Sequence, residues 1–280
     1  MFSFLKKIKL FKKRSVGKYL FKEALIKKKG LIHKSEKIET LAIGSSHCAL
    51  GFNTCVFSNS YNLGNTNQDL FTSYAIFEKV LPHLPNLKNL ILFYSVFSPG
   101  HELEKTSALK QQAINKYIFK VPYQNQELNN WKRAVKKGYK KFKDTDINYQ
   151  TFFGYWPLEE DRIIPFQEER AQKHLRENKR NCKQNKWVKE IINLSKKHNL
   201  SLTVVIPPAR NDYNLVINKT DEELFSPLFR LLKENRIPLL NLRQSELFKN
   251  EDFIDGDHLS QKGADKLTLL IKKSIHHEAC

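Results

Sequence analysis

The chain has 280 residues, of which 40% are hydrophobic, and it contains 48 Lys and Arg residues against 29 Asp and Glu, a formal net charge of +19. This length and apolar content suit one large domain or a domain with an insertion, and they exclude an intrinsically disordered chain. A charge of this size favours a polyanionic or acidic-membrane partner over a neutral one.

The positive charge lies in two segments. Residues 1–34 carry 12 basic residues and 1 acidic residue, and residues 101–200 carry 22 and 12, whereas 35–100 and 201–280 each have a net charge of −1. We therefore expect a basic amphipathic N-terminal arm over 1–34 and an α/β domain over 35–280, interrupted by a basic, aromatic-rich insertion or lid over 101–180.

Residues 1–29 interleave Phe, Leu and Ile with lysines, which is the composition of a helix that lies on an anionic membrane surface. A solvated, partly disordered basic arm is the alternative. No unbroken apolar stretch resembles a secretory signal or a membrane span. The cysteines form no CxxC pair, so we expect reduced thiols and no structural zinc. The expected location is cytoplasmic, with residues 1–29 able to hold the protein peripherally on the inner face of the cell membrane.

The two nearly neutral blocks read as alternating strands and helices. Short apolar runs predict strands, and residues recurring at helical spacing predict the helices between them. The expected strands are 41–44, 89–97, 202–206 and 238–242, and the expected helices are 70–81, 187–198, 222–235 and one starting near Gln261 with Ser260 as its N-cap. Strands that alternate with helices predict a parallel sheet covered on both faces, whose ligands bind beyond the carboxyl ends of the strands.

The insertion contains two aromatic, lysine-rich stretches, YIFKVPYQNQELNNWKRAVKKGYKKFKD and YQTFFGYWPLEED. Aromatic side chains among lysines can stack on sugars or bases while the lysines neutralise phosphate. The alternative is a packed helical subdomain whose aromatic residues form its own core. The first interpretation suits a sugar-nucleotide or lipid-linked sugar substrate, or a coenzyme A donor.

Two short motifs could carry chemistry. The first strand ends directly in GSSH, which places Ser46 on the strand-to-helix turn at the binding edge, and IDGDH near the end of the chain places Asp255 and His258 three residues apart. A serine becomes a nucleophile when a histidine takes its proton, and that histidine needs an acceptor on its other nitrogen. Ser46, His258 and Asp255 could fill these roles. Asp257 is adjacent to His258, so their side chains should point apart.

At this point the sequence resembles the SGNH (GDSL-type) hydrolases, in which the nucleophile follows the first strand and an Asp-x-x-His precedes the last helix. The pattern GSSx…NLG…DGxHLxxxGA resembles most closely the SGNH-like proteins associated with bacterial surface polysaccharide biosynthesis, over residues 39–100 and 180–275. The resemblance implies a three-layer, flavodoxin-like α/β fold with a parallel central sheet. It also implies Ser46 as nucleophile, His258 as general base and Asp255 as the residue that orients the base.

The same resemblance implies an oxyanion hole with two departures from the family pattern. In YNLGNTNQD, Asn62 and Gly64 match the second motif, but the glycine whose amide usually joins the oxyanion hole is replaced by Asn67, a residue type that tolerates a left-handed backbone. The third motif reads SVFS, so its asparagine donor is missing. Losing one such donor typically lowers the rate about 10²-fold to 10³-fold, unless Asn65, Asn67, Ser95 or Ser98 substitutes for it. Backbone amides near Ser46 and Gly64 are expected to hold the oxyanion.

The function expected from these residues is that of a serine esterase or O-acyltransferase acting on a bacterial surface polysaccharide or its precursor through an acyl-serine intermediate. No cofactor is expected, although acetyl-CoA could supply the acyl group in a transferase. The first alternative is a catalytically degenerate SGNH-fold protein that binds glycan or an anionic membrane surface. A nucleic-acid binder is the second, and it rests on net charge alone.

The motif residues also have structural interpretations. Ser46 could cap the helix that follows it, and His258 could be a surface histidine that caps a turn. His47 and Cys48 have no partner motif, so packing is the expected role of both. The terminal HHEAC has metal-binding residue types at no recognised metal spacing, and we expect a frayed tail.

Overall fold

The computed structural model describes residues 18–142, 153–155, 168–179, 182–218 and 221–277. Its centre is a five-stranded sheet in which all neighbouring strands are parallel, in the order β2-β1-β3-β4-β5. This is the flavodoxin-like order, so the expected fold class is confirmed. The strands are β1 (Thr40–Ile43), β2 (Ser60–Asn62), β3 (Asn89–Phe93), β4 (Ser201–Ile206) and β5 (Leu239–Asn241).

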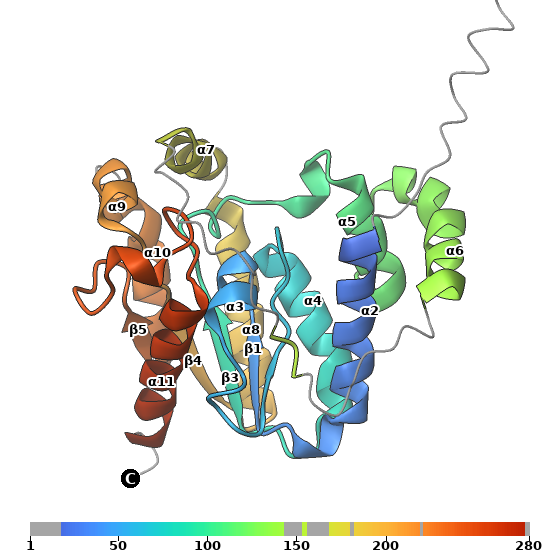
Figure 1. Cartoon of the computed structure of the whole chain (residues 1–280), viewed down its shortest axis with the longest axis horizontal. Helices are drawn as coiled ribbons and strands as arrows, with labels where there is room; N and C mark the ends of the chain where they lie inside the picture. Colours follow the sequence, from blue (N-terminus) through green and yellow to red (C-terminus); the bar gives the residue numbers. More distant parts are fainter. Residues whose placement is uncertain (1–17, 143–152, 156–167, 180–181, 219–220, 278–280) are drawn as a thin grey trace, which may run out of the picture.

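Helices cover both faces of this sheet, giving three layers (Figure 1). Helices α3 and α11 contact each other over one face, and α4, α8 and α10 form the layer on the other. The described helices are α2 (Lys18–His33), α3 (Ser46–Gly51), α4 (Leu70–Val80), α5 (Leu109–Ile114), α6 (Lys132–Phe142), α7 (Glu168–Lys179), α8 (Asn185–Lys197), α9 (Asn211–Ile217), α10 (Asp221–Asn235) and α11 (Gln261–His277).

The strand sequences explain the two cores, because successive side chains of a strand point to opposite faces. In β3, Leu90 and Leu92 join the larger core beneath α4 and α8, while Ile91 and Phe93 join the smaller core beneath α3 and α11. Both faces of these strands are apolar because both are covered, which is the pattern typical of parallel sheets.

The structure differs from the expected strands in two places. Strand β3 ends at Phe93 instead of residue 97, because the chain turns there and the Ser98 hydroxyl accepts a hydrogen bond from the Ser95 amide. Strand β2 was not predicted as a strand, since its three residues are too few to show a period. At the last helix, the Ser260 hydroxyl accepts from the Gly263 amide at 3.3 Å, as expected for a cap.

The described part of the N-terminal arm expected over 1–34 is not separate from the domain. Residues 1–17 lie outside the described residues, and residues 18–33 form α2, which is part of the main core. Its buried apolar side chains are Phe21, Ala24, Leu25, Ile26 and Leu31. The charge boundary at residue 34 is therefore not a packing boundary, because α2 buries an apolar stripe, and Lys27 and Lys34 of this basic segment are buried with it. None of the described helices has the length and apolar character needed to cross a bilayer.

The described part of the insertion expected over 101–180 divides into two bodies (Figure 1). Helices α5 and α6 and the π-helical turn η5 (Asn115–Phe119) pack against α2, and Phe119, Tyr123 and Trp131 are buried there. These three aromatic residues form core, as the packing alternative expected. Helix α7 instead packs against α9, above the carboxyl ends of the strands.

We predict that α2 is required for the stability of the domain. Replacing fully buried Phe21 with Ala should lower the free energy of unfolding by about 3 to 5 kcal/mol, through lost burial and the cavity left behind. Ile32 on the same helix is 53% exposed, so Ile32→Ala should change that free energy by no more than about 0.5 kcal/mol. Urea unfolding measures the free energy of unfolding of both variants. If Phe21→Ala lowered it as little as Ile32→Ala does, α2 would be an arm independent of the domain.

Candidate active site

Ser46 stands at the edge of the sheet where the strand order reverses. It is the first residue of α3 and follows β1 through Gly44, whose φ of +148° and close approach to Phe93 leave no room for a Cβ. The neighbouring Ser45 is the N-cap of α3, and its hydroxyl accepts from the His47 amide. Ser45 therefore performs the capping role that the sequence also allowed for Ser46, whose hydroxyl remains available for other contacts.

The loop before α11 is shaped by one carboxylate. Asp255 Oδ1 accepts hydrogen bonds from the backbone amides of Asp257 at 3.0 Å and His258 at 2.8 Å, which closes a tight turn. Its other oxygen, Oδ2, lies 2.8 Å from His258 Nδ1. One side chain therefore sets both the course of the loop and the orientation of the imidazole.

Ser46, His258 and Asp255 form a continuous hydrogen-bonded chain. His258 Nε2 lies 2.8 Å from Ser46 Oγ, across 212 positions of sequence. An ionised Asp255 can only accept, so Nδ1 carries the proton and Nε2 presents its lone pair to the serine hydroxyl. Burial tends to raise the pKa of Asp255, but its hydrogen bond and charge interaction with His258 bring that pKa below the usual value.

A cavity of about 340 Å³ opens over this chain. Its wall contains few apolar side chains, chiefly Ala49, Leu50 and Phe97, and several charged ones contributed by α2 and α7. The lining residues are Glu23, Lys27, Ser46, Ala49, Leu50, Thr66, Asn67, Phe97, His101, Arg170, Lys173, His174, Glu177 and His258. Helix α7 therefore contributes side chains to the wall of the site.

The four residues predicted for oxyanion or substrate binding lie in different places. Asn67 lines the cavity and has a φ of +60°, the left-handed conformation that its residue type tolerates. The Gly64 amide donates to Asn62 Oδ1 at 3.0 Å, and the Asn65 side-chain amide donates to Gln68 Oε1 at 3.0 Å. Ser95 Oγ contacts His47 Nδ1. Of the four, only Asn67 lines the cavity.

A second histidine array lies directly behind the first. His47 Nδ1 is 2.8 Å from Ser95 Oγ, and its Nε2 is 2.9 Å from Asp257 Oδ2. The His47 and His258 rings are stacked with centroids 5.0 Å apart. His47 is 6% exposed, and this burial lowers its pKa. The array is buried and lies outside this cavity, so it cannot reach a substrate there. The stacked His47 ring can still hold the His258 ring in place from behind.

Arg170 of α7 ties the two arrays together. Its Nε donates to Asp257 Oδ1 at 2.5 Å, and one terminal nitrogen lies 3.2 Å from His258 Nδ1. Burial would raise the pKa of Asp257, yet neighbouring positive charge and the hydrogen bond from His47 hold it well below its usual value. The result is a partly buried ion pair beside the candidate base.

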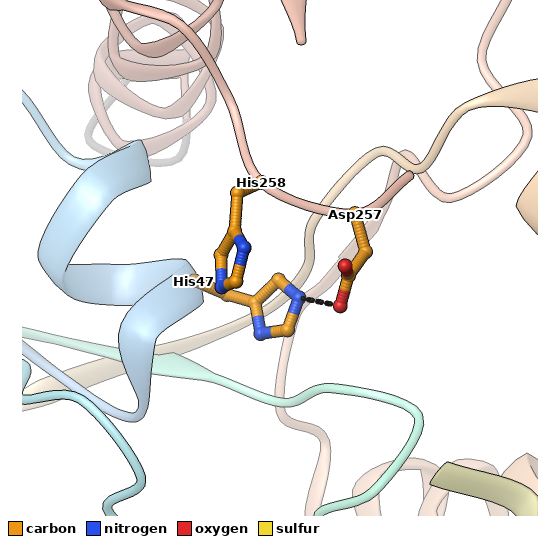
Figure 2. A group of neighbouring side chains, drawn as sticks. All are labelled: His47, Asp257 and His258. Atoms are coloured by element: carbon orange, nitrogen blue, oxygen red, sulfur yellow. Dashed lines mark hydrogen bonds and ion pairs between the residues drawn. The ribbon is translucent and has the colours of Figure 1, made fainter. Parts of the chain in front are cut away.

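Within the described residues, His47, Asp257 and His258 also have the residue types and spacing of a metal site (Figure 2). Their ligand atoms lie within 4.8 Å of one another. The Arg170 guanidinium already bonds to Asp257 and contacts His258, so a metal cation would face a fixed positive charge. The residues present therefore fit a hydrogen-bonded array better than a metal ion.

Sequence reasoning did not identify the second array or the charges around it. Arg170 and His174 lie in a segment rich in charged residues, and no local spacing links them to Asp257. His47 and Cys48 were expected to pack, and both are buried. Burial raises the pKa of the Cys48 thiol to about 12, which removes it as a thiolate nucleophile near neutral pH.

Comparison with known proteins adds a family and a set of loose structural similarities. A family model described as a protein of unknown function, DUF1574, matches residues 105–273. No curated protein matches the sequence.

Three solved structures are similar to the chain at 12% sequence identity. A candidate acylhydrolase from Bacteroides fragilis NCTC 9343 has a TM-score of 0.43, with 85% of this chain and 86% of that one covered. A candidate lipolytic protein of the G-D-S-L family from Desulfitobacterium hafniense DCB-2 has a TM-score of 0.41, with 84% and 97% covered. A candidate platelet activating factor from Streptococcus pneumoniae has a TM-score of 0.44, with 91% and 94% covered.

We predict that mild acid destabilises the protein through its buried histidines. Burial lowers the pKa of His174 to about 3, whereas a histidine in the unfolded chain titrates near 6.5. Below about pH 6.5 the unfolded chain therefore binds a proton that the folded protein does not, and stability falls as pH falls. Each such group should contribute about 1.4 kcal/mol per pH unit between roughly pH 6 and pH 4.

Urea unfolding between pH 7 and pH 4.5 measures this slope. His174→Gln should make the slope smaller by the contribution of one group, whatever its effect at neutral pH. His83→Gln, which removes an exposed imidazole, serves as the control. A slope unaffected by His174→Gln would contradict the prediction.

Proposed function

We propose that this chain, which belongs to the DUF1574 family of proteins of unknown function, is a serine esterase or O-acyltransferase that works through an acyl-Ser46 intermediate. The observation that carries the proposal is the hydrogen-bonded chain from Ser46 Oγ through His258 to Asp255, with both contacts at 2.8 Å. A hydroxyl, an imidazole in the correct tautomer and an ionised carboxylate are the three components of serine acyl transfer.

In the first half of the reaction, Ser46 Oγ attacks the acyl carbonyl of an ester and its proton passes to His258 Nε2. Asp255 stabilises the imidazolium that forms. When the tetrahedral intermediate collapses, the bond to the alcohol breaks and His258 returns the proton to the departing oxygen. The acyl group is then an ester of Ser46.

The second half repeats these steps with a new nucleophile. Water or a second alcohol gives its proton to His258 Nε2 and attacks the acyl-Ser46 carbonyl. Collapse then restores the Ser46 hydroxyl with the proton from His258. Water releases the acid and makes the protein an esterase, whereas an alcohol makes it a transferase. The same three residues serve both outcomes.

The oxyanion would be held mainly by backbone amides. The Ser46 amide is at the first turn of α3, where the helix supplies no carbonyl acceptor, and Asn67 borders the same cavity. Ser95 is engaged with His47, and Asn65 with Gln68, so neither replaces the missing asparagine donor as placed. We therefore expect turnover to be slower, by about 10²-fold to 10³-fold, than with a complete set of donors.

The lining of the cavity favours a short acyl group and a hydrophilic alcohol. Ala49, Leu50 and Phe97 offer a small apolar surface close to Ser46, whereas α2 and α7 line the rest with paired charges such as Lys27 with Glu23. Charged pairs can exchange hydrogen bonds with hydroxyl groups, while a long acyl chain would leave them unsolvated. This supports a sugar or sugar-containing precursor as the alcohol, as the resemblance implies.

One observation favours the alternative of a non-catalytic binding protein. Of the side chains and amides expected at the oxyanion hole, the Gly64 amide and the side chains of Asn65 and Ser95 have internal partners. A site retaining the serine and histidine but unable to stabilise an oxyanion could bind the same alcohol without transferring an acyl group.

Labelling with an organophosphonate serine-hydrolase probe separates these two functions. The purified full chain should be labelled at Ser46, as located by peptide mass spectrometry, because His258 activates that hydroxyl. Labelling should be lost in Ser46→Ala and reduced by at least about 10²-fold in His258→Ala.

Ser45→Ala is the matched control, since it removes the adjacent hydroxyl, with its α3 cap and its contact to His47 Nδ1, but leaves the Ser46–His258 contact. It should keep labelling at Ser46 while losing about 1 kcal/mol of stability. Folded wild-type protein without any label at Ser46 would support the binding protein and refute the enzyme.

We also predict that the Arg170–Asp257 ion pair sets the pH range of activity. The imidazolium of His258 forms beside both charges during the reaction. Asp257→Asn leaves the Arg170 cation uncompensated, so the acid limb of the kcat/KM profile should move to lower pH by about one unit. Arg170→Gln leaves the Asp257 carboxylate uncompensated and should move that limb to higher pH.

The measurement is the pH dependence of p-nitrophenyl acetate hydrolysis in the two variants and in the double variant. The double variant should return the acid limb close to its wild-type position, because both charges are then absent. Shifts of both single variants in the same direction would contradict an electrostatic role and indicate that the pair is only structural.

A further inference from the structure

Helix α6 presents a dense row of positive charge to solvent. Its eleven residues, Lys132–Phe142, include six basic ones and no acidic one, and the six are exposed. They are Lys132, Arg133, Lys136, Lys137, Lys140 and Lys141. The opposite side of the helix is held in the fold by buried Ala134, Val135 and Gly138. The basic face is therefore fixed in position by packing.

Positive charge from neighbouring elements extends this face. Lys22 of α2 lies 5.9 Å from the ring centroid of Phe142, and Lys141 of α6 lies 5.4 Å from the same centroid, so lysines of two helices converge on one ring. On the same helix as Lys22, Lys28 donates to the Ile118 carbonyl of η5 at 2.7 Å. Helix α2 contacts both α6 and η5, so these charges belong to one side of the molecule.

Few acidic residues lie near α6 in the sequence. Residues 128–143 contain none; Glu127 precedes this stretch, and Asp144 and Asp146 follow it, against seven basic residues within it. Like charges on successive turns of a helix repel one another and lower its stability. Burial and the charge of Lys120 together lower the pKa of Lys28, which is consistent with crowding of positive charge on this side. A surface that retains this repulsion is suited to a polyanionic partner.

We propose that the exposed face of α6, together with Lys22 of α2, docks the protein on an anionic lipid bilayer. A bilayer is flat and presents many negative headgroups at once, so the six basic side chains of one helix can meet it simultaneously when the helix lies along the surface. Tyr139 lies on the same helix and is 47% exposed, and an amphipathic ring suits the headgroup region. This docking is independent of acyl transfer.

The features of the face favour lipid over nucleic acid. A nucleic-acid site would combine such charge with a groove or with several stacking aromatic side chains. Among the exposed large hydrophobic residues described, Tyr139 is the one on α6, and the aromatic residues Phe119, Tyr123 and Trp131 are buried. In the sequence, residues 1–17 precede α2 and contain six basic residues and no acidic one. These charges increase the attraction of the protein to a negative surface.

Sedimentation of the full chain with phospholipid vesicles tests the proposal. The protein should bind vesicles of phosphatidylcholine containing phosphatidylglycerol, should not bind phosphatidylcholine alone, and should bind less as salt rises from about 0.1 M to 0.5 M. Replacing Lys136 and Lys140 with Gln removes two charges from adjacent turns of the exposed face and should weaken binding roughly 30-fold.

Lys189→Gln with Lys197→Gln removes two exposed charges from α8 and is the matched control, which should change binding less than about threefold. Three outcomes would overturn the proposal. One is failure of the wild type to bind anionic vesicles, and another is equal loss in the α8 control. The third is tighter binding to a random-sequence DNA duplex than to the vesicles at equal salt, which would make nucleic acid the polyanion.

Discussion

The carboxylate of Asp255 is the contact from which the site is built. It accepts hydrogen bonds from two amides of its own loop, which fixes the turn before α11, and it holds His258 Nδ1 at 2.8 Å. These contacts give His258 a single tautomer whose free nitrogen faces Ser46 Oγ. Without this carboxylate the loop would lose its turn and the imidazole its orientation, so structure and chemistry depend on the same side chain.

The sheet brings this loop to the serine. The strand order reverses at β1, so the turn after β1 and the turn after β3 lie side by side at one edge, and the loop before α11 closes over them. This arrangement also creates the second array. Ser95, which follows β3, and Asp257, in the loop before α11, both contact His47. The ion pair between Arg170 and Asp257 links α7 to that array. It therefore holds α7, which lines the cavity, next to His258.

Much of the fold and the three residues of the hydrogen-bonded chain could be predicted from the sequence, because local signals exist for them. Apolar runs and helical spacing identify four of the five strands, and the three-residue separation of Asp255 and His258 places both on one turn. The remaining features depend on long-range contacts. The sequence near Arg170 shows nothing that pairs it with Asp257, 87 residues away. Charge alone does not reveal that α2 buries Phe21 and even the side chain of Lys27.

The central claim is that Ser46 carries the acyl group during turnover, and trapping that ester tests it most directly. Full-length protein mixed rapidly with p-nitrophenyl acetate, quenched in acid and digested should yield a peptide that carries one acetyl group on Ser46, and this species should be absent from Ser46→Ala. Turnover that continues in Ser46→Ala, or an acetyl group found on another residue at the rate of turnover, would contradict the acyl-serine mechanism.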